Sequence, residues 1–192
     1  MNLKSIFQKF REHEELKDKH ALLSPSNYRW LGYDDDRFKD FITSSQAAVI
    51  GTKKHALAAM CIELGQNLPR SKKTLCNYVN DAIAFKMKPE VTLVYSQNCF
   101  GTADAIVLDE KNSLLRVHDL KTGVMPAKMD QLRIYAALFC LEYGYSPYNL
   151  EFELRIYQND EIVVEKPCSD DIQTVMDIIV QRDAEICAMN EV

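Results

Sequence analysis

The chain has 192 residues, of which 47% are hydrophobic and 27% charged, and its formal net charge is −5. This length suits one domain with a substantial core, and the scarcity of glycine and proline, six of each, argues against a disordered or low-complexity chain. No apolar run is long enough to span a bilayer and the N-terminus lacks the apolar core of a signal peptide, so we expect a cytoplasmic protein without a membrane partner.

The first half of the sequence predicts helices. Apolar residues at helical spacing indicate the first of them; they are Leu3, Ile6, Phe7, Phe10 and Leu16. A short helix is expected from Pro25, which suits a first turn. The acidic run 34–36 favours another helix start, and we interpret its three aspartates as capping and solubilising residues. Two longer helices are predicted over 47–64 and 71–86.

From Pro89 the pattern changes to strands. Runs of β-branched and apolar residues with short links predict three adjacent antiparallel strands over 91–95, 103–108 and 114–120. Further elements are a helix over 125–143, a hairpin over 151–157 and 161–165, and a closing helix capped by Ser169. We therefore predict an α/β fold in which a central mixed β-sheet is flanked by α-helices. It forms a single domain over 1–192, with a mainly helical part (1–88) and a sheet core plus C-terminal helix (89–192).

Charge is unevenly distributed along the chain. Residues 53–88 hold seven basic residues and two acids, whereas residues 151–192 hold three basic residues and eleven acids. Two interpretations stay open: one side faces phosphates, or both are simply solvated faces. The six cysteines are scattered without a Cys-x2-Cys pair, so we interpret them as buried thiols and expect no zinc site.

Two carboxylates and a lysine are predicted to meet on the sheet. If the second and third strands pair through the turn 109–113, Asp104 and Asp119 are cross-strand neighbours, and alternation places Lys121 on the same face as Asp119. Two carboxylates this close repel unless a cation lies between them, and hard oxygen ligands suit Mg²⁺ or Mn²⁺. Gln131 and Tyr135 project from one face of the next helix. Taken alone, Asp119-x-Lys121 is better explained as a surface strand pair, and Gln131 with Tyr135 as a helix face packed on the sheet.

The order of these motifs resembles the PD-(D/E)XK nuclease superfamily. Gly101-x-x-Asp104, Asp119-x-Lys121 and Gln131-x-x-x-Tyr135 are similar to the branch that contains the RecB nuclease domain, phage lambda exonuclease and the CRISPR-adaptation nucleases. The string Gly51-Thr52-Lys53-Lys54-His55 resembles the upstream Gly-x-x-x-His helix of that branch. The resemblance implies a restriction-endonuclease-like core, encoded by a phage and working in the cytoplasm of the bacterial host.

The resemblance also implies roles for individual residues. It makes Asp104, Asp119 and Lys121 catalytic. The ligands of Mg²⁺ or Mn²⁺ would be His55, Asp104, Asp119 and the backbone carbonyl of Leu120. Substrate would be bound by Gln131, Tyr135, Thr122, Lys53 and Lys54. The iron–sulfur cysteines of the CRISPR-adaptation branch are missing, so we expect no iron–sulfur cluster.

The function expected from this resemblance is metal-dependent hydrolysis of DNA phosphodiester bonds, by an exonuclease or a processing enzyme of phage recombination or repair. Single- or double-stranded DNA would be the partner, together with further copies of the chain or a phage recombination protein. The alternative is a catalytically weak or inactive nuclease-fold protein that engages nucleic acid or host machinery. A phage assembly or structural domain is a third hypothesis.

Overall fold

The computed structural model of the chain describes residue 23 and residues 25–190, so the helix predicted from Leu3 to Leu16 lies outside the described residues. The chain divides into two compact units, Met1–Ala48 and Val49–Val192. All residues of the site described below belong to the second unit. The prediction of a single domain stays a prediction.

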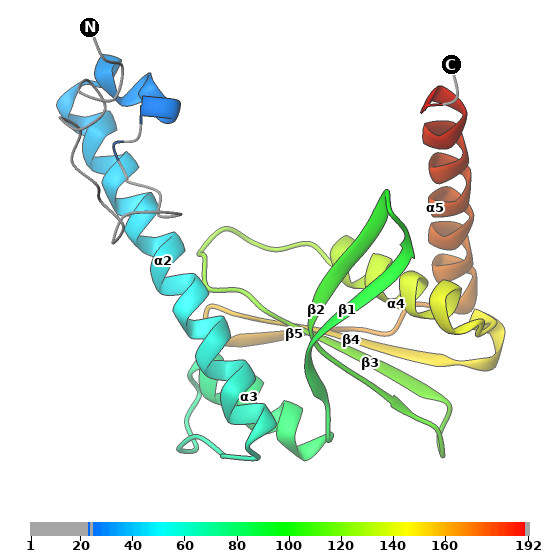
Figure 1. Cartoon of the computed structure of the whole chain (residues 1–192). Helices are drawn as coiled ribbons and strands as arrows, with labels where there is room; N and C mark the ends of the chain where they lie inside the picture. The colour runs from blue at the N-terminus through cyan, green and yellow to red at the C-terminus, as the bar shows by residue number, and fades with distance from the viewer. Residues whose placement is uncertain (1–22, 24, 191–192) are drawn as a thin grey trace, which may run out of the picture. The chain divides into compact units, whose positions relative to one another are not determined.

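The described chain is an α/β protein, as predicted, with one five-stranded mixed sheet (Figure 1). The helices are η2 (Pro25–Gly32), α2 (Asp35–Glu63), α3 (Thr74–Ala84), α4 (Asp130–Tyr143), η3 (Pro147–Asn149) and α5 (Ser169–Asn190). The strands are β1 (Lys88–Ser96), β2 (Cys99–Asp109), β3 (Leu114–Leu120), β4 (Glu151–Gln158) and β5 (Glu161–Glu165). Among the described helices, none is long and apolar enough to cross a membrane.

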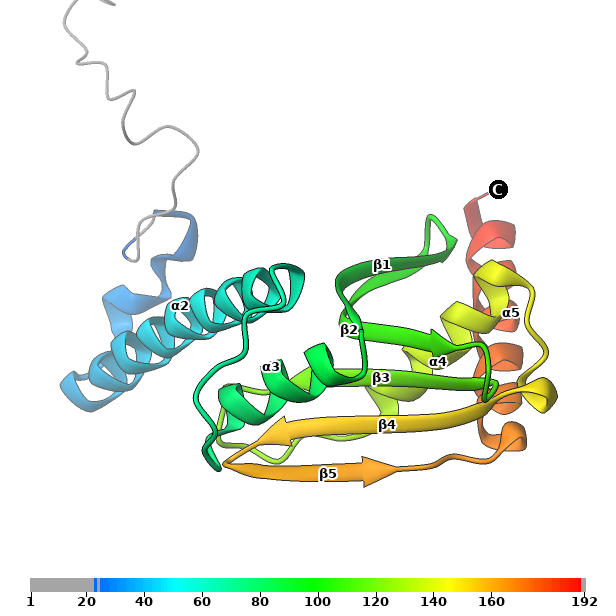
Figure 2. The same cartoon turned by 90° about the horizontal axis from the view of Figure 1, so that it is seen from below.

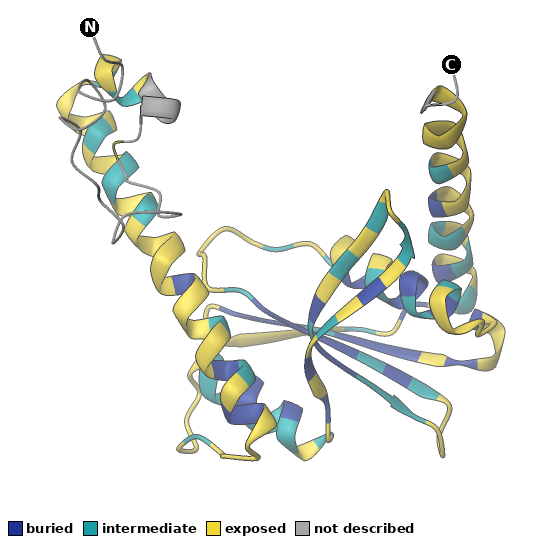
Figure 3. Cartoon of the chain, in the orientation of Figure 1, coloured by how far each residue is buried: buried dark blue, intermediate teal, exposed yellow. Residues whose placement is uncertain are grey.

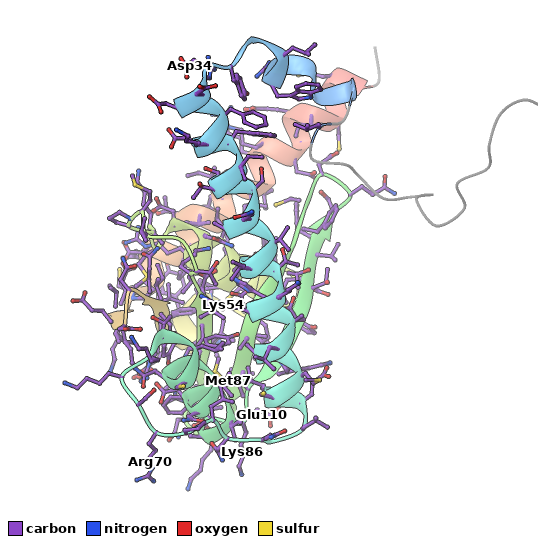
Figure 4. All side chains as sticks on the ribbon, turned by 90° about the vertical axis from the view of Figure 1, so that its left-hand side faces the viewer. Asp34, Lys54, Arg70, Lys86, Met87 and Glu110 are labelled. Carbon is purple, nitrogen blue, oxygen red and sulfur yellow. The ribbon has the colours of Figure 1, made fainter. Side chains whose placement is uncertain are left out.

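One continuous helix replaces the two helices predicted between residues 34 and 64. The carboxylate of Asp34, labelled in Figure 4, accepts a hydrogen bond from the backbone N–H of Arg37 at 2.8 Å and so caps the start of α2. No proline interrupts the following residues, and α2 runs for 29 residues. The helix ends before Gly65, whose φ of +63° suits a residue without a side chain.

The sheet has the strand order β1-β2-β3-β4-β5. The first three strands pair antiparallel through short turns, as predicted, and β4 and β5 form the predicted hairpin. Parallel pairing of β3 with β4 requires a crossover, and α4 provides it. β3 is the middle strand, and its C-terminal end lies at the opposite end of the sheet from the turn that joins it to β2.

Helices cover both faces of the sheet. Figure 2 shows α3 in front of β3 and β4 and α4 behind them. On the α4 face, Leu115 and Val117 pack with Leu132 in the larger core, whereas Leu120 and Tyr157 pack in a second core on the α3 face. Figure 3 shows buried residues in dark blue along these central strands. Burial on both faces fixes the register of β3, because a slip of one residue would exchange the two faces.

The β1–β2 hairpin separates from the rest of the sheet near Asp104. Within β2, residues 105–106 pair with both neighbours and residues 107–109 pair with β3, whereas the residues before Asp104 pair only with β1. On β1, the opposing residue is Glu90, whose φ of 50° is unusual for a strand residue with a side chain. Figure 1 shows the hairpin rising away from β3, β4 and β5. The resulting fork places Asp104 at the C-terminal end of β3.

The loop between β3 and α4 is longer than predicted, because α4 begins at Asp130 rather than near residue 125. Pro126 removes a backbone N–H from this stretch, and the buried side chain of Gln158 holds the loop. Its amide nitrogen donates to the carbonyls of Gly123 and Met125 at 2.6 and 2.8 Å, and its oxygen accepts from Ala127 N–H at 3.1 Å.

Candidate metal centre

The carboxylate of Asp104 is placed by the fork in the sheet. Where β2 leaves β3, the backbone N–H of Leu120 has lost its ladder partner, and Oδ2 of Asp104 accepts it at 2.8 Å. This contact fixes the carboxylate next to the end of β3. The side chain remains 17% exposed, so it is still accessible from solvent.

His55 reaches the same carboxylate from α2. Gly51, His55, Ala58 and Ile62 follow each other at helical spacing, and all four are buried or half-buried, so His55 lies on the face of α2 that packs inward. Its Nδ1 is 3.4 Å from Oδ2 of Asp104. This hydrogen bond raises the pKa of His55 above its ordinary value, against the opposing effect of burial.

Glu90 is the third member of the cluster. The donor atoms of His55, Glu90 and Asp104 all lie within 4.8 Å of one another. Glu90 is exposed, but partial desolvation by its neighbours, and next the charge of Asp104, raise the pKa of its carboxyl. Two acids and an imidazole that converge in this way offer nitrogen and oxygen ligands of the kind that divalent cations bind.

Asp119 and Lys121 lie beside this cluster as an ion pair. The Asp119 side chain is only 2% exposed, and both its oxygens are 3.0 Å from Nζ of Lys121. Only the contact to Oδ1 has hydrogen-bond geometry, and Oδ2 is buried without a hydrogen-bond partner in the described structure. Burial, and next the charge of Asp104, raise the pKa of Asp119, and Lys121 opposes them. The arrangement leaves one buried oxygen that a cation would satisfy.

A chain of hydrogen bonds runs from Lys121 to α4 and back to β2. Nζ of Lys121 donates to Oε1 of Gln131 at 2.8 Å, and Nε2 of Gln131 donates to the Tyr135 hydroxyl at 3.2 Å. That hydroxyl donates to the carbonyl of Thr102 at 2.6 Å. The i, i+4 spacing of Gln131 and Tyr135 thus positions the lysine.

Both motif glycines allow close approach of a neighbouring element. A Cβ on Gly101 would lie 3.1 Å from Cε1 of Tyr135, so a larger residue would push the tyrosine off β2. A Cβ on Gly51 would lie 2.7 Å from Oγ1 of Thr122, in the loop after β3. These glycines bring α4 and α2 close enough to the sheet for their side chains to meet Asp104 and Lys121.

The structure thus brings His55, Asp104, Asp119 and Lys121 together at one end of the middle strand. Leu120 lies between the two motif residues of β3, but its N–H makes the contact with Asp104, and the role of its carbonyl stays a prediction. The other predicted substrate-binding residues surround the cluster: Thr122 and Lys54 line a cavity next to it, and Lys53 is exposed on α2.

Glu90 was not among the site residues predicted from the sequence. Glu90 follows Pro89 at the first predicted strand and matches no motif, and the one available signal was an acid in an otherwise apolar strand. Conversely, the neighbour of Asp119, His118, is no ligand candidate. It faces the other side of β3, where burial and then Arg155 and Arg116 lower its pKa to about 3.

Comparisons with protein-family models and with curated proteins identified no relative of the chain. No protein-family model matches the chain, and no curated protein matches it. The geometry of the site therefore carries the functional argument.

Proposed function

We propose that the chain is a metal-dependent nuclease that hydrolyses DNA phosphodiester bonds on a restriction-endonuclease-like core of the PD-(D/E)XK type. The observation that carries this proposal is the cluster of His55, Glu90 and Asp104 next to a buried Asp119 that is paired with Lys121. The role suggested by the motifs, an exonuclease or processing enzyme of phage recombination or repair, belongs to the same proposal.

The donor set fits Mg²⁺ or Mn²⁺. Carboxylate oxygens are the preferred ligands of both ions, and an imidazole nitrogen is better suited to Mn²⁺ than to Mg²⁺. The buried Oδ2 of Asp119 supports the assignment, because it accepts no hydrogen bond among the described residues, although the ammonium of Lys121 lies 3.0 Å away. When bound, the cation would supply Lewis acidity toward a phosphoryl oxygen and the attacking water.

The chain's own residues would orient the reactants. Gln131 and Asp119 hold the ammonium of Lys121 from two sides at 2.8 and 3.0 Å. In this position Lys121 can hydrogen-bond to the attacking water or offset the charge that develops on the phosphate. Tyr135 holds Gln131 in turn, so its contribution is to position Lys121.

The sheet topology supports the proposed core. The motifs lie on an antiparallel β1–β2–β3 unit followed by a parallel α4 crossover, which places Asp104, Asp119 and the α4 residues on neighbouring elements. This support is an analogy at the level of the fold, so the residues of the site decide the function.

The proposal is tested with the purified full-length chain on single- and double-stranded DNA in Mg²⁺ or Mn²⁺. We expect cleavage that EDTA stops and that falls by about a thousandfold in Asp119→Asn or Lys121→Gln, the scale of loss typical of a transition-state contact. The matched control is Glu110→Gln, an exposed acid in the turn after β2, which should cut at the wild-type rate.

Two results would overturn the proposal. Absence of cleavage on every DNA with either metal would contradict the enzyme. DNA or partner binding that survives Asp104→Ala, with no cleavage by the parent protein, would favour the nuclease-fold binding protein instead.

A further inference from the structure

A cavity of about 310 Å³, lined in part by Lys121, lies next to the acidic cluster of His55, Glu90 and Asp104. Four chain segments line it: Lys54 of α2, the start of α3 at 73–75, the end of β3 and the following loop at 120–122, and the β4–β5 turn at 159–160. Figure 4 labels Lys54 on α2. Because Lys54 precedes His55 and Leu120 follows Asp119, the cavity and the candidate metal centre share two backbone segments.

The cavity carries positive charge. Its described lining residues include three lysines and one acid, Asp160. Asp160 is already bound, since its carboxylate pairs with Lys73 at 2.9 Å and accepts the backbone N–H of Thr74 at 2.9 Å. Lys121 is paired with Asp119, whereas Lys54 forms no ion pair among the residues that the structure describes. The ammonium of Lys54 is therefore available to an incoming anion.

The size and chemistry of the cavity fit one nucleotide unit. Pockets for small ligands span roughly 300–1,000 Å³, so this one lies at the lower end and cannot hold a duplex. Leu75 and Leu120 provide apolar surface for a sugar, and the lysines and Thr122 provide donors for phosphate oxygens. The cavity is lined mainly by lysines and the neighbouring cluster contains two acids, so a phosphate suits the cavity and a cation suits the cluster.

We propose that this cavity binds the phosphate next to the one that is cut, with Lys54 as its main cationic contact and the ion-paired Lys73 as a second positive charge beside it. This inference rests on the proposed function. A phosphate in the cavity would fix the strand so that the neighbouring phosphodiester lies at the acidic cluster. The bound group is either a terminal phosphate or an internal phosphodiester, which share the same oxygen chemistry.

Fluorescence anisotropy on short oligodeoxynucleotides tests the cavity separately from cleavage. Every protein carries Asp119→Asn to prevent cutting, and the ligands end in a 5′-phosphate, a 3′-phosphate or hydroxyls only. Lys54→Gln/Lys73→Gln should weaken binding by about tenfold or more, the loss of one charge-assisted hydrogen bond. The control Lys72→Gln/Lys111→Gln removes the same charge from exposed positions outside the cavity and should lose much less.

The ligand series identifies the source of the phosphate. A loss confined to one phosphorylated end indicates a terminal phosphate, and an equal loss on all three indicates an internal phosphodiester. The single variant Lys54→Gln leaves the Lys73–Asp160 ion pair intact, so a loss of binding in this variant cannot be caused by breaking that pair. Asp160→Asn provides a test of opposite sign, because it removes the only acid among the described lining residues and should tighten binding even if it lowers stability.

Equal losses in the cavity and control variants, or no oligonucleotide binding at all, would overturn the cavity assignment. Failure of the two proposals can be told apart. If the chain with its native Asp119 cuts DNA but the cavity variant binds oligonucleotides as tightly as the control, only the assignment of the cavity is wrong. If oligonucleotide binding depends on Lys54 and Lys73 but neither metal supports cleavage, the cavity binds phosphate and the proposed nuclease activity is wrong.

Discussion

At the scale of single residues, Glu90 carries the most information beyond the motifs. A non-glycine residue with positive φ inside a strand is disfavoured, and such conformations concentrate at functional sites. Here the unusual backbone coincides with the fork of the sheet and with a carboxylate beside His55 and Asp104. The strain thus points to Glu90 as a ligand.

We predict that Glu90→Gln weakens Mn²⁺ binding by about tenfold or more. Replacing even a residue that only hydrogen-bonds to a metal ligand typically lowers metal affinity by this factor. Isothermal titration calorimetry measures the effect directly and requires no activity. Glu110→Gln is again the matched control and should bind Mn²⁺ like the wild type. Unchanged affinity in Glu90→Gln would remove this residue from the ligand set.

At the scale of elements, the local patterns were sufficient for most boundaries. Residues 114–120 form β3 as predicted, because Leu115 and Val117 alternate with Leu114 and Arg116 in a short segment that follows a turn. The two helices predicted between residues 34 and 64 are one helix, since Asp34 caps its start and no proline interrupts it before Gly65. The late start of α4 depends on Gln158, which lies 31 to 35 positions from the loop residues that it binds, so no local pattern contains it.

The packing of α2 on the loop after β3 predicts an unusual response to alanine. In an open helix, Gly→Ala stabilises by about 1 kcal/mol. At Gly51 the new Cβ would meet Oγ1 of Thr122 at 2.7 Å, so we expect Gly51→Ala to destabilise by about 1–3 kcal/mol. Urea denaturation measures the change. Adding Thr122→Ala should recover the loss, and failure of this rescue would mean that α2 does not approach the loop so closely.

The β4–β5 turn is tied to α3 through Asp160, and this tie should depend on pH. Hydrogen bonds from Lys73 and then from Thr74 lower the pKa of Asp160 to about 2. Because the folded pKa lies below the unfolded one, the stabilisation is complete above about pH 4 and is lost as the pH falls towards 2. Asp160→Asn should therefore lower the urea midpoint near neutrality, with a difference from wild type that disappears in acid. Glu161→Gln serves as a control, and a difference that persists in acid would contradict the assigned cause.

At the scale of the whole molecule, the site combines residues that are far apart in the sequence. Asp104 and Asp119 were predictable as neighbours because a short turn joins β2 to β3. Spacing placed Gln131 and Tyr135 on one face of α4, and the resemblance assigned them to substrate, whereas the hydrogen bond from Lys121 to Gln131 is known only from the structure. Glu90 was not predictable, since its place depends on how β1 follows β2 away from the sheet. The cavity was hidden for a similar reason: its lining comes from α2, α3, β3 and the β4–β5 turn, which meet only through tertiary packing.

The location of the candidate ligands within one compact unit gives a last prediction. A ligand that binds only the folded state at about 100 times its Kd stabilises that state by about 2.7 kcal/mol. His55, Glu90, Asp104 and Asp119 all belong to the unit Val49–Val192. Saturating Mn²⁺ should therefore slow amide hydrogen exchange in β1, β2 and β3, and leave η2 and the first turns of α2 unchanged. Asp104→Asn should abolish the effect, whereas Glu110→Gln should preserve it. Equal protection of both units, or protection that persists in Asp104→Asn, would place the bound metal elsewhere.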